Sequence, residues 1–304
     1  MNKRQLIVQK QFVTNEKAVI RELKHEYSKA LAEIEERIKI LQASELTQSK
    51  IYQLEYQLSL RNQISTILDG MRSGNYDTIS KYLNDCYTEA FVGTMFDLQG
   101  QGIPLAFPIN QSQAIKAVQL DSKISSGLYT RLGFNVQELK KTISSEISRG
   151  LSSGLSYSRI AKGLERVAGV DLSKSLNIVR TEGHRIQNQS SLDVMHKAQS
   201  CGADIMKQWD ATLDGVTRDT HRKLDGQIVG IDEDFIVDGM SAPYPGGFGD
   251  PSEDCNCRCC VLQRAKWNLD NFNATKLDNE SGKVVQFQEK DYQSFKTAYF
   301  QALG

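Results

Sequence analysis

Proline is absent from the first hundred residues, and the first one in the chain is Pro104. Because proline interrupts helix interiors, this absence leaves a long stretch able to form uninterrupted helices. The chain also lacks a run of 18 apolar residues, and its start lacks the basic and apolar segments of a secretory signal, so neither a membrane span nor a leader is expected. The sequence therefore predicts a soluble protein made in the cytosol.

Net charge is also lacking, since 37 basic side chains are balanced by 37 acidic ones. This balance excludes a protein that coats nucleic acid through overall positive charge. The charges are unevenly distributed, because residues 101–200 carry 13 basic and 7 acidic side chains whereas residues 201–260 carry 5 and 12. We therefore expect any contact with a polyanion to lie within residues 101–200.

Apolar residues near the start recur at intervals of three and four, the spacing of one helical face. They are Leu23, Tyr27, Leu31, Ile34, Ile38 and Leu41. The pattern predicts a long amphipathic helix over residues 23–41 and a second over 51–71, which ends in a turn at 72–75. A third helix is expected over 77–98, before the glycine- and proline-containing segment 100–104. The first two helices are expected to pair as a hairpin within a helical bundle.

Shorter helices are predicted in the middle of the chain. They cover residues 112–120, 135–149, 159–167 and 172–200, with a turn at 168–171 between the last two. Asn135 and Glu138 have the spacing of a capping box at the start of the second of these helices. Cys201 and Gly202 are expected to end the last one, because glycine is favoured just beyond a helix C-terminus.

Beyond residue 204 the sequence changes to short apolar runs separated by Asp-Gly pairs at 214–215, 225–226 and 238–239. Asp-Gly is a strong signal for a tight turn between antiparallel strands. We expect a small sheet with irregular loops here. Two prolines and three glycines in residues 243–249 then exclude regular structure from that segment.

Together these elements predict a mainly α fold with a small α+β module in the C-terminal part. A long N-terminal helical hairpin or bundle would be followed by a turn-rich domain with a short antiparallel sheet. A strand near residues 283–287 and a helix over 292–303 would close the chain. The expected segments are a long-helix domain over 1–104, a short-helix region over 105–174, a turn-rich module over 175–260 and a C-terminal extension over 261–304.

Four of the six cysteines are clustered, at Cys255, Cys257, Cys259 and Cys260. In a cytosolic protein such a cluster is more typical of a metal site or of free thiols than of a disulfide. Cys257 and Cys259 can reach one ion, and His221 can supply a nitrogen ligand, which is a donor set that suits zinc. A fourth ligand stays open among Cys255, Cys260, His184 and Asp219. The alternatives are reduced, partly buried cysteines, or a cysteine nucleophile paired with His221.

The segment from Arg180 to Glu182 lies within a predicted helix and has two structural interpretations. Glu182 can pair with Arg185, three residues further along the helix. Arg180 can instead reach into the C-terminal loops and bridge an acidic turn at Asp214 or Asp225. The second interpretation is a clamp between helix and sheet, and we favour such a structural role over a catalytic one.

Many of these residues form an ordered motif. Its members are Arg180, Glu182, Trp209, Asp214, Arg218, His221, Asp225, Gly226, Phe235, Asn256, Cys257, Arg258 and Cys259. The set resembles the phage head morphogenesis family, the Mu F-like minor head proteins. The resemblance is strongest over residues 175–260, and the helical half upstream is similar to minor capsid proteins of tailed phages. The additional Cys255 and Cys260 depart from the family pattern.

The resemblance implies a minor structural protein of the virion, without enzymatic activity, inside the procapsid near the portal. Its partners would be the portal protein and other head proteins. Its role would be in head assembly and in DNA packaging or ejection, with delivery into the host in some members. The protein would be made in the cytoplasm of the bacterial host. Some relatives carry a toxin domain after the cysteine motif, but the 44 residues that follow Cys260 are too few for a typical enzyme domain.

Two other classes of function stay open. In an ADP-ribosyltransferase-like enzyme, Arg180 would hold the NAD phosphates and a later glutamate would act on the ribose. The sequence after Arg180 has neither a clear Ser-Thr-Ser strand nor a Glu-x-Glu pair, which disfavours this class. The other alternative is a DNA-binding protein that is not part of a virion.

Overall fold

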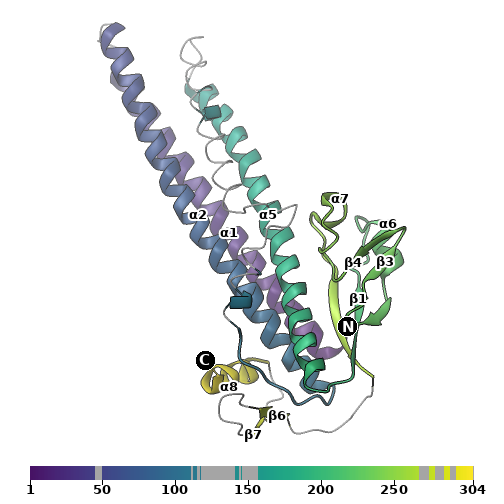
Figure 1. The fold of residues 1–304 in the computed structure, drawn as a ribbon. Helices are drawn as coiled ribbons and strands as arrows, with labels where there is room; N and C mark the ends of the chain where they lie inside the picture. The colour runs from purple at the N-terminus through teal and green to yellow at the C-terminus, as the bar shows by residue number, and fades with distance from the viewer. Residues whose placement is uncertain are drawn as a thin grey trace. The chain divides into compact units, whose positions relative to one another are not determined.

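The computed structural model describes most of the 304 residues. The described ranges are 1–44, 50–110, 112–114, 117, 141–143, 145, 157–266, 274–277, 284–287 and 292–303. Three long helices account for much of this, namely α1 (Lys3–Ser44), α2 (Lys50–Gly100) and α5 (Tyr157–Ser200) (Figure 1). The shorter helices are α6 (Asp219–Leu224), α7 (Pro251–Asp254) and α8 (Tyr292–Leu303).

The strands are short and lie in the C-terminal part of the chain. They are β1 (Ile205–Asp210), β2 (Ile228–Gly230), β3 (Phe235–Val237), β4 (Met240–Ala242), β5 (Cys260–Ala265), β6 (Ala274–Leu277) and β7 (Val284–Phe287). These elements confirm the expected mainly α fold with a small antiparallel sheet. None of the helices in the described ranges combines the length and apolarity needed to cross a membrane.

The described residues form two compact units, and α1, α2 and α5 contribute to both. Unit 1 contains residues 1–16, 82–125 and 179–304, and unit 2 contains residues 17–81 and 126–178. Each unit therefore combines segments that are distant in sequence.

Helix α2 is continuous where the sequence predicts a turn at residues 72–75 and two separate helices. The prediction of a turn is wrong because the apolar face continues through this segment, with Leu68, Met71 and Ile79 all buried. Glycine within a helix costs about 1 kcal/mol relative to alanine, and this cost is offset by packing of the buried face.

Helix α5 is also continuous, whereas a turn is predicted at residues 168–171. Leu164, Ala168, Ser175 and Val179 are buried and keep one helical face directed inward through the segment. Gly169 lies on the exposed side, where an added side chain would meet no atom within 4 Å. The predicted helices at 112–120 and 135–149 fall largely outside the described residues.

Glycines end two of the long helices, as the sequence predicts. Beyond α2, Gly102 has a φ of 85° and its amide donates to the Gln99 carbonyl at 3.1 Å, while the Ile103 amide donates to Leu98 at 2.9 Å. Gly202 beyond α5 has a φ of 89°. Both conformations are left-handed, which glycine adopts without steric penalty, so the chain can leave each helix sharply.

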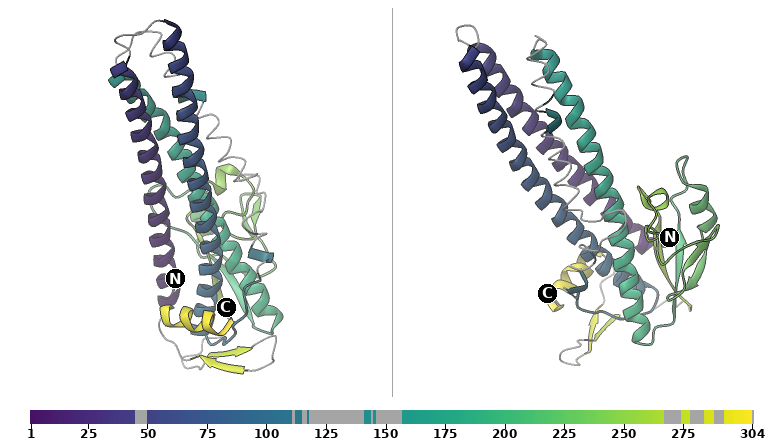
Figure 2. Two further views of the ribbon diagram at one scale, coloured as in Figure 1. Left: turned by 90° about the vertical axis from the view of Figure 1, so that its left-hand side faces the viewer. Right: turned by 45° about the horizontal axis from the view of Figure 1, so that its top comes forward.

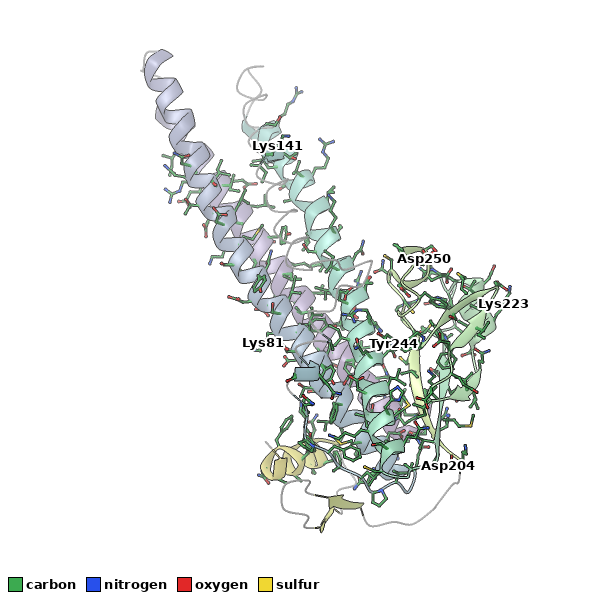
Figure 3. All side chains as sticks on the ribbon, viewed as in Figure 1. Lys81, Lys141, Asp204, Lys223, Tyr244 and Asp250 are labelled. Atoms are coloured by element: carbon green, nitrogen blue, oxygen red, sulfur yellow. The ribbon has the colours of Figure 1, made fainter. Side chains whose placement is uncertain are left out.

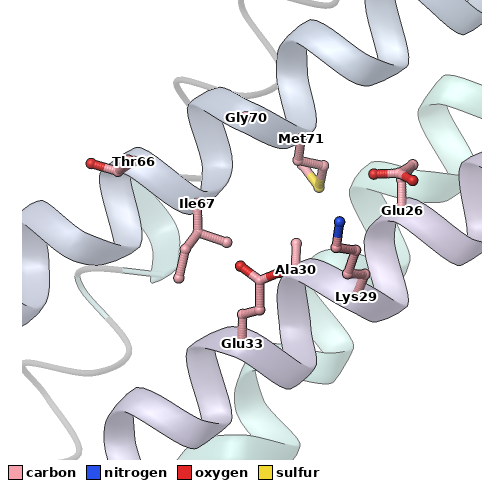
Figure 4. Close-up of a pocket in the computed structure, with 8 residues that line it drawn as sticks. All are labelled: Glu26, Lys29, Ala30, Glu33, Thr66, Ile67, Gly70 and Met71. Carbon is pink, nitrogen blue, oxygen red and sulfur yellow. The ribbon is translucent and has the colours of Figure 1, made fainter.

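Unit 2 has a core of helical side chains. Its buried members are Tyr27, Ala30, Ile34, Ile64, Leu68, Met71, Ile143, Leu164 and Ala168. A groove lies over α1 and α2 in the same unit (Figure 4). It is lined by Glu26, Lys29, Ala30, Glu33, Thr66, Ile67, Gly70 and Met71. A Cβ added at Gly70 would meet no atom within 4 Å, so the groove has open space at this position.

Unit 1 contains an antiparallel sheet in the order β2-β1-β5 and a separate β3-β4 hairpin. Lys207 in the central strand lies opposite Val229 of β2 and Gln263 of β5. Asp238 and Gly239, with φ values of 48° and 81°, form the predicted tight turn between β3 and β4. A further hairpin pairs β6 with β7.

Helix α8 packs beside the C-terminal end of α2, and Figure 2 shows the two elements together. The rings of Tyr292 and Phe295 lie 5.3 and 5.5 Å from that of Phe96. Tyr292 also donates to the buried Glu89 carboxylate at 2.7 Å, and Lys296 pairs with the same group. The end of the chain is therefore anchored by both apolar and polar contacts.

Candidate metal centre

Three predicted ligands, His221, Cys257 and Cys259, lie together and are buried. His221 is on α6, and both cysteines are in the segment between α7 and β5. The His221 Nδ1 atom is 3.3 Å from the Cys259 sulfur and 3.7 Å from the Cys257 sulfur. The three ligand atoms lie within 4.8 Å of one another, so this group could hold a metal ion.

The second ring nitrogen of His221 faces a carboxylate. Its Nε2 atom is 3.1 Å from Glu253 Oε2, an oxygen that also accepts a hydrogen bond from the Thr220 hydroxyl at 2.8 Å. Histidine ligands of metals commonly donate their other nitrogen to a carboxylate, which fixes the ring orientation and the tautomer. Glu253 lies close enough to Nε2 to take this role, although no hydrogen bond joins the two groups in the structure.

The two thiols are electrostatically unequal. The hydrogen bond from Cys257 lowers the pKa of Cys259, and His221 adds to this effect. The same pairing, together with burial, raises the pKa of Cys257. Because metals bind thiolates, a cation bound by this group would hold both sulfurs in the deprotonated form.

Aromatic side chains enclose the group. The buried Trp209 ring lies 5.5 Å from the His221 ring, 5.3 Å from Phe235 and 5.9 Å from Phe248. Phe248 also stacks on His221 at 6.1 Å. Such a shell limits solvent access to the sulfurs, which favours a structural site over an open catalytic one.

The proline- and glycine-rich loop at 243–249 is fastened by Asp254. Its two carboxylate oxygens accept from the amides of Phe248 at 3.1 Å and Gly249 at 2.7 Å. Gly246 lies beside Arg185 and has a φ of 84°, a left-handed conformation that glycine adopts without steric penalty. The loop is irregular, as the sequence predicts, and the two hydrogen bonds to Asp254 hold its backbone.

Asn188 of α5 bonds to the loops that follow the helix in the chain. The sequence analysis missed this residue. Its side-chain amide donates to the carbonyls of Pro245 at 3.0 Å and Cys259 at 3.1 Å, and its oxygen accepts from the Val261 amide at 2.8 Å. The available signal was weak, since a single asparagine on a helix is common. Thr181 makes a further link by accepting from the Asn256 amide at 3.0 Å. Figure 3 shows Tyr244 of the same module lying against α5.

The motif residues of α5 form one predicted pair and not the other. Glu182 accepts from Arg185 at 2.8 Å, as expected, and Arg185 also donates to the Ala117 carbonyl at 3.0 Å. Arg180 does not reach Asp214 or Asp225, because it pairs with Glu16 of α1 at 3.4 Å. The suggested bridge from Arg180 to the acidic turns is therefore wrong.

The remaining motif residues organise the loops around the sulfurs. Arg258 pairs with Asp214 at 2.6 Å, which lowers the pKa of that exposed carboxyl. Arg218 donates to the Cys255 carbonyl at 2.7 Å. Asp225 accepts from the Ala211 amide at 2.9 Å, and Gly226 has a φ of 81° that suits glycine in the turn before β2. The first two contacts join the loop that precedes His221 to the segment that carries the cysteines.

The suggested fourth ligands do not join the group among the residues that the structure describes. His184 lies instead beside Glu16, at 3.5 Å. The Cys260 sulfur is directed to the Arg258 carbonyl, and Asp219 is exposed. Within the described ranges, three side chains are thus grouped as donors, namely His221, Cys257 and Cys259.

Comparison with known proteins gives one family and two relatives. Residues 141–262 match the family described as Phage Mu protein F like protein. The chain is 31% identical over 269 residues to the NAD(+)--arginine ADP-ribosyltransferase EFV of Enterococcus faecalis, an alignment that covers 87% of this chain and 54% of that protein. It is 32% identical over 151 residues to the Minor head protein GP7 of Bacillus phage SPP1, covering 49% of each. The chain therefore spans about half the length of the curated relatives it matches. No solved structure matches it.

Proposed function

Residues 141–262 belong to the Phage Mu protein F like family of head morphogenesis proteins, and from this premise we propose that the chain acts as a minor head protein inside a phage capsid. The observation that carries the proposal is that the matched range holds one connected structure. It contains the part of α5 that bears Asn188 and Thr181 and the module to which both side chains bond. A long helix joined by buried hydrogen bonds to a folded module suits a protein that assembles with other head proteins.

We place this function near the portal, in procapsid assembly and in DNA packaging or ejection. The portal protein is the proposed partner, and the capsid interior is the proposed location. From that location the chain could be delivered into the host with the DNA. Quantitative mass spectrometry of purified procapsids and mature heads tests this, with a few copies per particle expected. Absence of the chain from both particles would overturn the proposal.

We further propose that the metal is zinc and that Cys257, Cys259 and His221 bind it. Two sulfurs and one imidazole nitrogen are the donors that zinc prefers, and the buried aromatic shell suits a structural site. Elemental analysis of the purified full chain should find about one zinc per chain, since structural zinc is stoichiometric.

The double variant C257S/C259S should lose this zinc. The matched control is C86S/C201S, which removes two cysteines that lie outside the metal centre. Zinc that persists in the first variant, or wild-type protein with less than about a tenth of an equivalent, would contradict the assignment.

Contact with packaged DNA is proposed for residues 101–200, where basic side chains outnumber acidic ones. Binding of duplex DNA should then weaken steeply with salt. Cross-linking to a duplex followed by peptide mapping locates the contact. Cross-links confined to residues 201–304 would refute this part of the proposal.

A second candidate function is transfer of ADP-ribose, which the alignment with the enterococcal protein favours. That protein extends well beyond the part that this chain matches, and Arg180 here is engaged with Glu16. We therefore expect no turnover of NAD by this chain. An assay of NAD consumption with an arginine analogue as acceptor decides the matter, because turnover that disappears in Arg180→Ala would establish the enzymatic alternative.

A further inference from the structure

The outward face of α1 in unit 1 carries a strip of basic and aliphatic side chains. The strip, called the α1 strip below, consists of Lys3, Leu6, Ile7, Lys10 and Val13, all of which are exposed. The aliphatic members are unusually open for their type, with 47% exposure at Leu6 and 49% at Val13. The lysine spacing of seven residues, close to two helical turns, keeps the two charges on one side.

No acidic side chain offsets the charge of the α1 strip within residues 1–15. Glu16, the first acidic residue of the chain, is turned to Arg180 and His184 of α5. The same seven-residue spacing of lysine continues in the sequence at Lys17 and Lys24. The strip is therefore a positive surface with an apolar component.

A surface of the opposite kind lies on the module of the same unit. The turn Asp232-Glu233-Asp234 joins β2 to β3, and all three acidic residues are exposed. Ile228 and Ile236 stand on either side of the turn with 51% and 64% exposure. The Gln227 side-chain oxygen accepts from the Ile236 amide at 3.3 Å, which holds the two strand segments together. Below, the acidic patch means Asp232, Glu233 and Asp234 together with Ile228 and Ile236.

Part of the acidic charge has partners within the chain. Asp232 lies 3.4 Å from His196 in an exposed pair, and Glu233 accepts from the Gly230 amide at 2.8 Å. The buried Lys207 ammonium lies near the turn, but it donates to the Pro243 carbonyl at 2.8 Å. The patch therefore keeps a negative, solvent-facing surface.

We propose that the α1 strip of one copy binds the acidic patch of a second copy. The two surfaces have opposite charge, and each exposes aliphatic side chains that the contact would remove from water. Strip against strip or patch against patch would bring like charges together, so the strip of one copy must face the patch of the other. A two-fold dimer with two such contacts and a head-to-tail assembly both satisfy this condition. This association goes beyond the proposed role in the phage head and does not rest on it.

The strength of the contact depends on its ion pairs and on the aliphatic surface that it buries. Exposed ion pairs contribute little individually, so aliphatic burial supplies most of the attraction while charge sets orientation and partner choice. We expect reversible association that is stronger at low ionic strength, since salt screens surface charges.

Sedimentation velocity over a concentration series, at low and at high salt, measures this association. The variant K3E/K10E disrupts the strip and D232K/D234K disrupts the patch, and each should weaken self-association at least about tenfold. All four positions are exposed, so the variants should fold, and circular dichroism verifies this.

Sedimentation of a mixture of the two variants is the decisive measurement. The intact patch of K3E/K10E faces the intact strip of D232K/D234K, and the two altered surfaces are also complementary in charge. Association should therefore return in the equimolar mixture. A mixture that stays monomeric, or a wild-type chain that stays monomeric at low salt, would overturn the proposal.

A matched control removes the same amount of charge elsewhere. Lys162 and Arg166 are exposed on α5, outside the strip and the patch. The variant K162E/R166E should associate like the wild type. Equal loss of association in this control would show a general charge effect and would also overturn the proposal.

Discussion

Asn188 shows how one side chain can determine whether a site is assembled. It is buried, and it satisfies two carbonyls and one amide from two loops that the sequence separates from it by more than 50 residues. A buried polar group without a partner costs more than a hydrogen bond gains. The residue therefore stabilises the fold and the metal centre together.

Replacing Asn188 with alanine should lower the free energy of unfolding by about 2–4 kcal/mol, because it leaves three buried backbone groups unpaired. Urea denaturation of the metal-loaded chain measures this change. The control is Asn177→Ala on the exposed side of the same helix, for which we expect a change within about 0.5 kcal/mol. Equal effects of the two substitutions would contradict the role assigned to Asn188.

Asp97 is a buried carboxylate held by amides instead of by a cation. Its oxygens accept from Asn2 at 2.6 Å, Gln5 at 2.8 Å and Gln101 at 2.7 Å, and Gln263 also donates to it. Burial raises the pKa of Asp97, although these hydrogen bonds oppose the shift. The charged form is therefore less favourable in the folded protein than in the unfolded chain.

The sign of the resulting pH dependence follows from linkage. A raised pKa means that the contribution of Asp97 to stability is fully present below the ordinary pKa of an aspartate and declines as the pH rises through the raised value. The difference in unfolding free energy between wild type and Asp97→Asn should therefore shift against the wild type over that interval. Chemical denaturation of both proteins across the acidic range checks this, and a difference that stays constant or moves the other way would contradict it.

At the scale of elements, two glycines of α5 differ in the space available for a side chain. A Cβ at Gly183 would lie 2.7 Å from the Tyr82 hydroxyl oxygen and 2.9 Å from its ring, so the glycine allows α2 and α5 to approach closely. Gly169 has open space around it. A helix gains from alanine over glycine only where the new methyl group fits.

Gly183→Ala should destabilise the protein by about 1–3 kcal/mol because the buried Tyr82 must move. Gly169→Ala should stabilise it by up to about 1 kcal/mol, since α5 is continuous through this position. Thermal unfolding of the two variants beside the wild type tests both signs at once. Destabilisation by Gly169→Ala would indicate that the helix is interrupted there, as the sequence analysis had predicted.

At the scale of the whole molecule, the two units depend on different interactions. Unit 2 has a core of helical apolar side chains, whereas the module of unit 1 encloses a His-Cys-Cys group within a thin aromatic shell. Small modules with little core gain much of their stability from a bound metal. Metal removal should therefore affect the two units unequally.

Hydrogen exchange with and without a chelator tests this expectation on the zinc-loaded chain. Peptides from residues 205–262 should exchange faster once the metal is removed, while peptides from residues 17–34 should keep their protection. The variant C257S/C259S should show the faster exchange without chelator. Unchanged exchange in residues 205–262 after verified metal loss would argue against a structural role for the ion.

Local patterns were sufficient for much of the fold and for the choice of His221, Cys257 and Cys259, which the structure brings together. The spacing of Leu23, Tyr27 and Ile34 predicted one buried helical face, and Asp238-Gly239 predicted the β3-β4 turn, because both signals act between near neighbours in sequence. The predicted turns near Gly74 and Gly169 failed, since packing of the buried faces outweighed a small local preference. The division into four sequential segments stays a prediction.

The sequence by itself determined the helical character of the chain, the turn-rich module and the donor set of Cys257, Cys259 and His221. Only the tertiary structure decided that Arg180 pairs with Glu16, that Asn188 bonds to the cysteine segment, and that Glu253 lies 3.1 Å from the second ring nitrogen of His221. The physical reason is the separation in sequence over which each interaction acts. Helix and turn signals depend on the energetics of a few consecutive residues, whereas a buried hydrogen bond or ion pair depends on which distant segments the folded core brings within about 3 Å.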